Sequence, residues 1–154
     1  MSAAEERLAE LEYMLPPPAP PVANYLPATR SGNVMWMAGV GPQLPDGSTI
    51  TGKLGDGMTT EQGYEAARWC ALNLLARMKA ELGDLDRVSR VLKVVGMVNS
   101  APDFDGQAEV VDGASDVFVA VFGERGRHSR SAPGMGALPR RCAVIVECVV
   151  EVAD

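Results

Sequence analysis

The sequence predicts one α+β domain in which two long helices lie on one face of a single β-sheet. The chain has 154 residues, the usual size of one domain, and is 47% hydrophobic and 22% charged, as folded globular proteins are. Strand-like and helix-like patterns follow one another as two or three strands, a helix, a strand, a helix and two strands. This order is typical of α+β domains with one sheet.

The N-terminal segment, residues 1–21, is predicted to form a helix followed by an extended arm. Leucines recur at helical spacing among charged side chains in residues 3–14, which indicates a short amphipathic helix. The proline run of residues 16–21 cannot continue a helix and lacks most amide donors for a sheet, so we expect a polyproline-like connector. Binding of this run to an SH3-type partner is the alternative. Residues 22–154 are predicted to form the main domain.

A hairpin and a long helix are predicted in the first half of the main domain. Residues 24–40 have strand-like patterns on both sides of the turn signal Ser31-Gly32-Asn33. Thr59 begins a capping-box sequence with Gln62, and apolar residues then recur every three or four positions until Gly83. This segment is expected to be the longest helix of the chain.

The second half is predicted to add a strand, a helix and two further strands. Residues 88–98 have the pattern of a buried strand, and residues 112–122 have that of a helix. The last two strands are expected at residues 132–138 and 142–152, joined at Pro139.

Apolar residues in the predicted strands leave little room for a solvent-exposed sheet face. Two helices can cover only one face, so we expect the other face to meet another subunit. The residues that carry this expectation are Met35, Met37, Val94, Val144 and Val146.

The charge balance and the cysteines narrow the function classes. A net charge of -6 argues against nucleic acid as a partner, because binding phosphates takes an excess of Lys and Arg. No apolar run approaches the length of a membrane span, and the acidic N-terminus lacks the features of a secretory signal, so we expect a cytoplasmic protein without membrane contact. With three cysteines, one histidine and no CxxC or HxxxH spacing, we expect reduced thiols and no metal site.

Arginines cluster in the last third of the chain, where five of the 14 basic residues lie within 17 positions. A guanidinium binds a carboxylate through two parallel hydrogen bonds, so such a cluster suits a small organic acid. A solvated loop with ion pairs is the alternative. The cluster consists of Arg125, Arg127, Arg130, Arg140 and Arg141.

Arg130 also begins a stretch that resembles the C-terminal signature of the Rid/YjgF family, which is also called L-PSP endoribonuclease-like. Other segments are similar to the family's first hairpin and to one uncharacterised branch of Rid-like proteins, and the likeness covers residues 15 to 152. The matching segments are Tyr25, Gly32-Asn33, Gly39, Asn99–Phe104, Gly113–Asp116, Gly123–His128, Arg130–Ala132, Leu138-Pro139 and Ala143–Glu147.

The resemblance implies a chorismate-mutase-like fold that assembles as a homotrimer, with helices outside, sheets in an inner barrel and clefts between subunits. Characterised members hydrolyse enamines and imines, such as 2-aminoacrylate, to 2-keto acids and ammonia without a metal or cofactor. The resemblance further implies that Arg130 clamps the substrate carboxylate, that Tyr25 lines the pocket, and that main-chain groups around Gly39 contact the ligand.

Several positions depart from the family pattern and make the predicted cleft more apolar. Ile145 stands where characterised deaminases have a glutamate, and an isoleucine cannot polarise water. Ala38 replaces the serine before the pocket glycine, and Val40 replaces a polar residue. The asparagine expected on the second helix falls near Asp112 or Gly113.

Other groups could assist the reaction. Glu147 lies on the last predicted strand, two residues beyond the isoleucine, and could reach the cleft or pair with an arginine. Asp112 could act as an acid or cap a helix, and Tyr25 could donate a proton or lie partly buried at a subunit seam. Met135 lies close to the predicted pocket. His128, the only histidine, could share the face of the cleft arginine or be an exposed loop residue.

The sequence therefore favours a metal-free enamine and imine deaminase with Arg130, Tyr25 and Glu147 as its catalytic residues. The alternative is a non-catalytic trimeric module that binds a small carboxylate, a hydrophobic metabolite or a partner protein in the same cleft. Endoribonuclease activity, which the family's older label suggests, needs a cationic track and an acid–base pair that this acidic chain does not offer. The predicted substrate-binding residues are Arg130, Tyr25, Gly39, Ala38, Asp112 and Met135.

Overall fold

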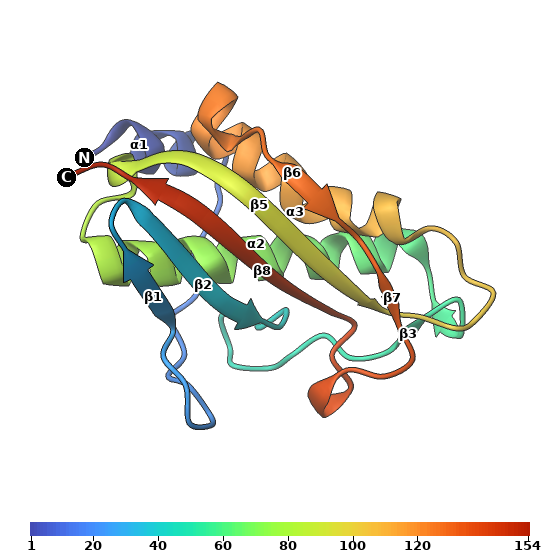
Figure 1. Ribbon diagram of the computed structural model, residues 1–154. Helices are drawn as coiled ribbons and strands as arrows, with labels where there is room; N and C mark the ends of the chain where they lie inside the picture. The colour runs from blue at the N-terminus through green and yellow to red at the C-terminus, as the bar shows by residue number, and fades with distance from the viewer.

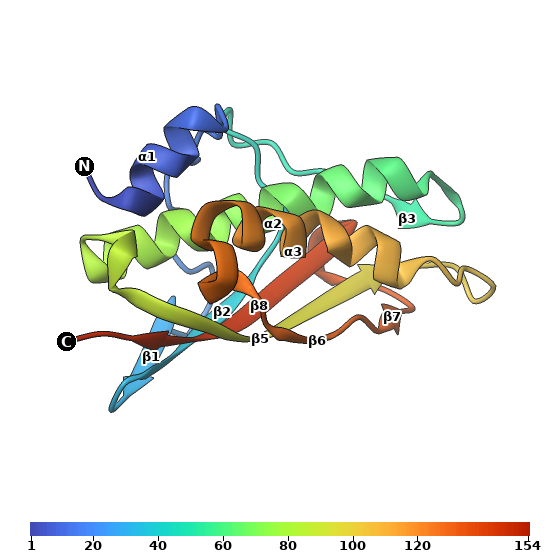
Figure 2. The ribbon, with the colours of Figure 1, turned by 90° about the horizontal axis from the view of Figure 1, so that it is seen from above.

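The computed structural model describes residues 1–154 as a mixed β-sheet with three α-helices on one of its faces (Figures 1 and 2). Figure 2 shows α1, α2 and α3 on the same side of the strands. The elements are α1 (Ala3–Glu10), β1 (Ala28–Ser31), β2 (Val34–Val40), β3 (Lys53–Leu54), β4 (Gly57–Met58), α2 (Thr60–Leu82), η1 (Leu85–Arg87), β5 (Val88–Asn99), α3 (Gln107–Phe122), η2 (Gly123–Gly126), β6 (Ser129–Ser131), β7 (Gly134–Met135), η3 (Pro139–Arg141) and β8 (Val144–Val152).

The two longest strands, β5 and β8, form the centre of the sheet and run antiparallel. The strand β2 pairs antiparallel with the other side of β8, and β1 pairs with β2 at that edge. At the opposite edge, the short strands β6 and β7 run parallel to β5. The predicted α+β class, with one main sheet and two main helices packed on one face, is confirmed.

The helix α2 begins and ends as its sequence predicts. The Thr59 hydroxyl accepts a hydrogen bond from the Gln62 amide at 3.2 Å, and the Gln62 side chain accepts one from the Thr59 amide at 2.9 Å. This capping box satisfies two amides that the first helical turn leaves without partners. Gly83, at φ 79°, ends the helix. Neither α2 nor any other helix is long and apolar enough to cross a membrane.

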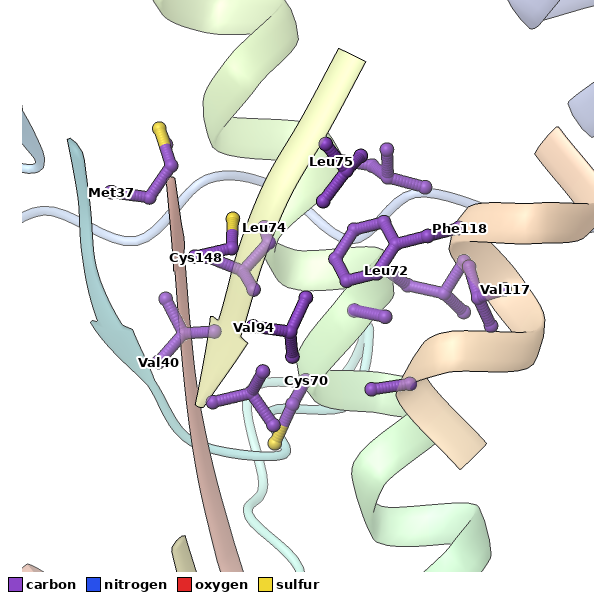
Figure 3. Packing of buried hydrophobic residues seen from close by; sticks show 14 of the residues in the cluster. Met37, Val40, Cys70, Leu72, Leu74, Leu75, Val94, Val117, Phe118 and Cys148 are labelled. Atoms are coloured by element: carbon purple, nitrogen blue, oxygen red, sulfur yellow. The ribbon is translucent and has the colours of Figure 1, made fainter. Parts of the chain in front are cut away.

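The hydrophobic core fills the space between the sheet and the helices α2 and α3 (Figure 3). Leu74 and Leu75 of α2 are fully buried, as are Val94 of β5 and Phe118 of α3. All three cysteines are free and buried. Burial raises the pKa of the Cys70 thiol well above its usual value, so this thiol stays protonated and acts as a packing residue.

The five residues from which a covered second sheet face was predicted all lie on the helix side. Met35, Met37, Val94, Val144 and Val146 are each buried, and the strand register places them in one layer. The basis of that expectation is therefore wrong, because the helices already cover these side chains. The open face instead presents a mixed set of half-buried or exposed side chains, which includes Trp36, Lys93, Val95, Met97, Ile145, Glu147, Val149 and Glu151.

Two helix boundaries differ from the sequence-based predictions. The third helix starts at Gln107 rather than at residue 112, so Asp112 lies inside α3 and does not cap it. The Gln107 side chain donates to the Phe104 carbonyl at 2.8 Å and folds the preceding loop against the start of the helix. The first helix ends at Glu10 rather than at residue 14, since Glu12 adopts φ 56° and turns the chain.

The predicted strand at residues 132–138 is also wrong. Instead, β6 and β7 pair separately with β5 and are divided by Pro133, which has no amide hydrogen for a ladder. The segment then ends in the short helix η3, where Arg140 and Arg141 have positive φ values of 55° and 60°.

The N-terminal helix packs on the main domain through its apolar side. Ala4 and Leu8 belong to the hydrophobic core, and the amides of Ala3 and Ala4 donate to the Asp86 carboxylate at 2.7 and 3.1 Å. The proline run forms neither helix nor strand. The division of the chain at residue 21 stays a prediction.

Replacement of Gly113 by alanine should destabilise the protein by about 1–3 kcal/mol, the usual cost of overpacking a core. A Cβ at Gly113 would lie against the backbone carbonyl of Tyr64, well inside van der Waals contact. This clash should outweigh the gain of about 1 kcal/mol that alanine brings to a helix interior. Urea unfolding measures the difference.

The matched control is Gly136→Ala, because a Cβ there would meet nothing within 4 Å. Equal stabilities of the Gly113→Ala and Gly136→Ala variants would contradict the proposed contact between α2 and α3.

Candidate functional site

A groove of about 890 Å³ lies at the edge of the sheet beside β2. The strand β1 pairs with β2 only as far as Met37, so the groove lies against the following stretch of β2. The N-terminal arm, the loop after β2, part of α2 and the turn around Arg140 complete its walls. The groove thus combines segments from both ends of the chain.

Five of the residues that the sequence places in the predicted cleft lie together in this groove: Tyr25, Ala38, Gly39, Val40 and Ile145. Tyr25 is 40% exposed, so a ligand in the groove can reach it. A Cβ at Gly39 would lie 3.0 Å from the Cγ2 atom of Ile145, so β2 passes close to this isoleucine. Apolar residues of β2 and β8 therefore meet in the groove.

Two polar side chains of α2, one helical turn apart, also line the groove. The Asn73 side-chain amide donates to the Gln43 and Trp69 carbonyls, both at 2.8 Å, and so holds the loop after β2. Arg77 is only 8% exposed, and its Nη2 atom donates to the Ala19 carbonyl at 3.3 Å. Its Nη1 atom is buried without any partner.

Asn73 and Arg77 are functional candidates that the sequence analysis missed. The position of Arg77 in the helical repeat could have identified it. It comes seven residues after Cys70 and three after Leu74, on the buried stripe of α2. A charged residue at such a position departs from the pattern of a helix that packs on a sheet.

Arg130 lies outside this groove, on the edge strand β6. It is in register with the buried Val94, so its side chain lies on the helix side of the sheet. Its Nη1 atom donates to Asp112 at 2.7 Å and to Ser115 at 3.1 Å, and its Nη2 atom donates to the Ala108 carbonyl at 3.1 Å. The structure thus joins Arg130 with Asp112 and binds both to α3.

His128 shares the Ser115 hydroxyl with Arg130. The Nδ1 atom of His128 lies 2.6 Å from the Gly126 carbonyl, which can only accept, so Nδ1 carries the proton. Nε2 then accepts from Ser115 at 2.9 Å. Burial and, to a smaller extent, the charge of Arg130 lower the pKa of His128, which keeps the ring neutral at pH 7. This network holds β6 to α3.

Glu147 and Met135 lie apart from both groups. Glu147 is exposed on the open face, where the register places it beside Val95, and thus on the opposite face from Arg130. Met135 lines a different hollow of about 440 Å³, together with Lys53. Within one chain, the predicted site residues therefore divide into four places.

The arginine cluster is divided in the same way. Arg140 lines the groove beside β2, whereas Arg125 pairs with Asp86 at 3.4 Å and donates to the Val88 carbonyl at 2.9 Å. For Arg125, the alternative of an arginine held in an ion pair therefore applies. No three His, Cys, Asp or Glu side chains lie together in a way that could hold a metal ion.

Comparison with known proteins gives the family. The family model "YjgF/chorismate mutase-like, putative endoribonuclease" matches residues 5–152. Protein TCP17 of Trypanosoma cruzi is 45% identical over 145 residues, which cover 94% of this chain and 91% of that protein. The crystal structure of Atu1372, a protein with unknown function from Agrobacterium tumefaciens, has a TM-score of 0.89 and 40% identity over 97% of this chain and 92% of that chain.

Two further crystal structures have the same fold as this chain. One is a "putative endoribonuclease" from Shewanella oneidensis MR-1. It has a TM-score of 0.94 and 31% identity over 98% of this chain and 100% of that chain. RidA from the Antarctic bacterium Psychrobacter sp. PAMC 21119 has a TM-score of 0.61 and 24% identity over 90% of this chain and 96% of that chain, so it supports the fold alone. The Rid/YjgF resemblance is confirmed, and the chain belongs to the YjgF/chorismate mutase-like family.

Proposed function

We propose that the protein binds small 2-imino and 2-enamino acids in the groove beside β2 and hydrolyses them to 2-keto acids and ammonia. In the imine form, water adds to the carbon of the C=N bond, and the nitrogen leaves as ammonia when the C=O bond forms. The protein has to hold the carboxylate, position the water and supply a proton to the leaving nitrogen.

The observation that carries this proposal is the meeting of Tyr25, Ala38, Gly39 and Ile145 in one groove. These residues come from the segment before β1, from β2 and from β8, and each matches or replaces a pocket position of the family that the sequence resembles. A groove of this volume also lies in the usual range for small-molecule sites.

The proposal includes a homotrimer in which the open sheet face is covered and Arg130 serves the groove of a neighbouring copy. The open face carries Trp36, which is 45% exposed, and the half-buried Val95, Ile145 and Val149. Arg130 lies on an edge strand and makes three hydrogen bonds, one of which is its ion pair with Asp112, so two of its five N–H donors stay free for a substrate carboxylate.

Glu147 and Tyr25 are the groups that we assign to proton transfer. Glu147 follows Ile145 on the same face of β8, about 7 Å further along the strand. It makes no ion pair within the chain, so in the proposed trimer its carboxylate is free to hold a water molecule between the copies. Tyr25, which lines the groove, is the group that we assign to donate a proton to the leaving nitrogen.

A second candidate function is binding without catalysis. Within one chain, Glu147 and Arg130 lie on opposite faces of the sheet, and an isoleucine lines the groove where deaminases have an acid. These observations favour a module that retains a small carboxylate or a hydrophobic metabolite.

Val149→Glu should convert the trimer to monomers, because it places a charge on the open face where the copies meet. Light scattering after size exclusion should give three times 16.3 kDa for the wild type and 16.3 kDa for the variant. Val119→Glu is the control, since Val119 is exposed on α3. A monomeric wild type would contradict the trimer.

Arg130→Ala should reduce the hydrolysis rate of 2-iminopropionate at least tenfold, since a charge-assisted hydrogen bond to a ligand contributes about 1.5–3 kcal/mol. The substrate is generated by an amino-acid oxidase, and the loss of imine is followed for wild type and variant. Arg127→Ala, in an exposed arginine of the same cluster, should keep the wild-type rate.

Thermal unfolding of the Arg130→Ala variant separates loss of the clamp from loss of the α3 contacts. A folded wild type that does not accelerate imine loss over buffer would refute the deaminase and leave the binding module.

Glu147→Gln should lower kcat about 100-fold or more with little change in KM, the usual range for removal of a general base. Glu151→Gln removes another exposed carboxylate from the same face of β8 and should have no effect. Equal kcat values for the two variants would exclude Glu147 as the base.

A further inference from the structure

We propose that Arg77 is an anion-binding residue of the groove, and that the groove takes organic acids with a large apolar side chain. The inference rests on the proposed function only in assuming that the ligand is an organic acid. It adds a cation that the family resemblance does not include, and it narrows the substrate class.

The first argument is the missing counter-ion of Arg77. The other two cations of α2 have acid partners, since Arg68 pairs with Glu65 and Lys79 pairs with Glu5, both at 3.1 Å. Arg77 has none, although it is far more buried than either, and a guanidinium cannot lose its charge in a protein. Buried charges in proteins are normally paired, so the unpaired guanidinium of Arg77 is suited to binding an anionic ligand.

The second argument is the charge of the groove as a whole. Its walls contain Arg77 and Arg140 but no aspartate or glutamate, in a chain whose net charge is -6. Arg140 holds a positive φ of 55°, a conformation that costs energy for a residue with a side chain. The groove is therefore a cationic site on an acidic protein.

The third argument is the point at which an anion can reach Arg77. The Nη1 atom is shielded from solvent, and Nη2 donates to the Ala19 carbonyl in the arm, which forms one wall of the groove. A carboxylate is a stronger acceptor for a guanidinium than an amide carbonyl is. We infer that the ligand carboxylate displaces the Ala19 carbonyl, after which the guanidinium fork can bind both carboxylate oxygens.

The fourth argument is the apolar lining, which sets the rest of the ligand. Pro20, Val22, Leu26, Trp36 and Ile145 all line the groove. Its volume of about 890 Å³ is much larger than a three-carbon acid requires. The ligand class is therefore an organic acid with an aromatic or branched apolar side chain, which includes the 2-imino acids with such side chains.

Calorimetric titration of the full chain with phenylpyruvate tests the inference. The wild type should bind phenylpyruvate at least tenfold more tightly than pyruvate. Arg77→Met should lower the affinity for phenylpyruvate at least tenfold. Arg68→Met removes a paired cation of the same helix outside the groove and should leave the affinity unchanged. Equal affinities of the wild type and Arg77→Met for phenylpyruvate, or no binding by the wild type, would overturn the inference.

Two further measurements test the inference without relying on the Arg77→Met affinity alone. They are the melting temperature of the variant and the preference of the wild type for a charged over a neutral ligand. Arg77→Met keeps the apolar stem and removes an unpaired buried charge, so its melting temperature should equal or exceed that of the wild type. If it does not fold, Arg77→Lys takes its place and should also weaken binding, because it lacks the guanidinium fork. The wild type alone should bind phenylacetate at least tenfold more tightly than the neutral phenylacetamide, and equal affinities would refute an anion site.

The imine assay keeps this inference separate from the proposed function. Hydrolysis of 2-iminopropionate together with an unchanged phenylpyruvate affinity in Arg77→Met would refute only the role of Arg77. Binding of phenylpyruvate through Arg77 without hydrolysis of any 2-imino acid would refute only the deaminase.

Discussion

The close contact between α2 and α3 is the constraint on which the rest of the structure depends. The central strands β5 and β8 need both helices to cover one of their faces, and Gly113 lets the helices meet at the Tyr64 backbone. This single layer of helices leaves the other face of the sheet uncovered, as Figure 2 shows. The open face therefore follows from this geometry, and Asn73 and Arg77 of α2 reach the groove beside β2.

The same packing fixes where positive charge is available. Three hydrogen bonds from Arg130 to α3 hold its guanidinium on the helix side of β6. The groove lies at the other edge of the sheet, so within one chain its positive charge comes from Arg77 and Arg140. Under the proposed trimer, Arg130 and the groove meet only across an interface, which makes assembly a condition for catalysis.

Local sequence signals predicted most of the fold. The predictions that were wrong concern segments whose structure depends on contacts with distant parts of the chain. The capping box at Thr59 and the apolar run of β5 each specify an element without help from elsewhere. The segment after Arg130 reads as one strand, but Pro133 divides it, and its two halves find partners on β5. Which face a strand residue occupies depends on a register that a single sequence does not contain, so Glu147 and Arg130 could not be assigned to opposite faces beforehand.

The replacement at Ile145 and the unpaired Arg77 have one physical explanation. A glutamate at position 145 would place a carboxylate in the same groove as two arginines, where it would compete with any anionic ligand for their hydrogen bonds. With isoleucine there, no carboxylate of the groove pairs with either guanidinium, and the apolar wall favours a ligand with a larger side chain. The residues of this groove are therefore suited to binding an organic anion, and the proposed hydrolysis assigns water activation to Glu147 on the open face.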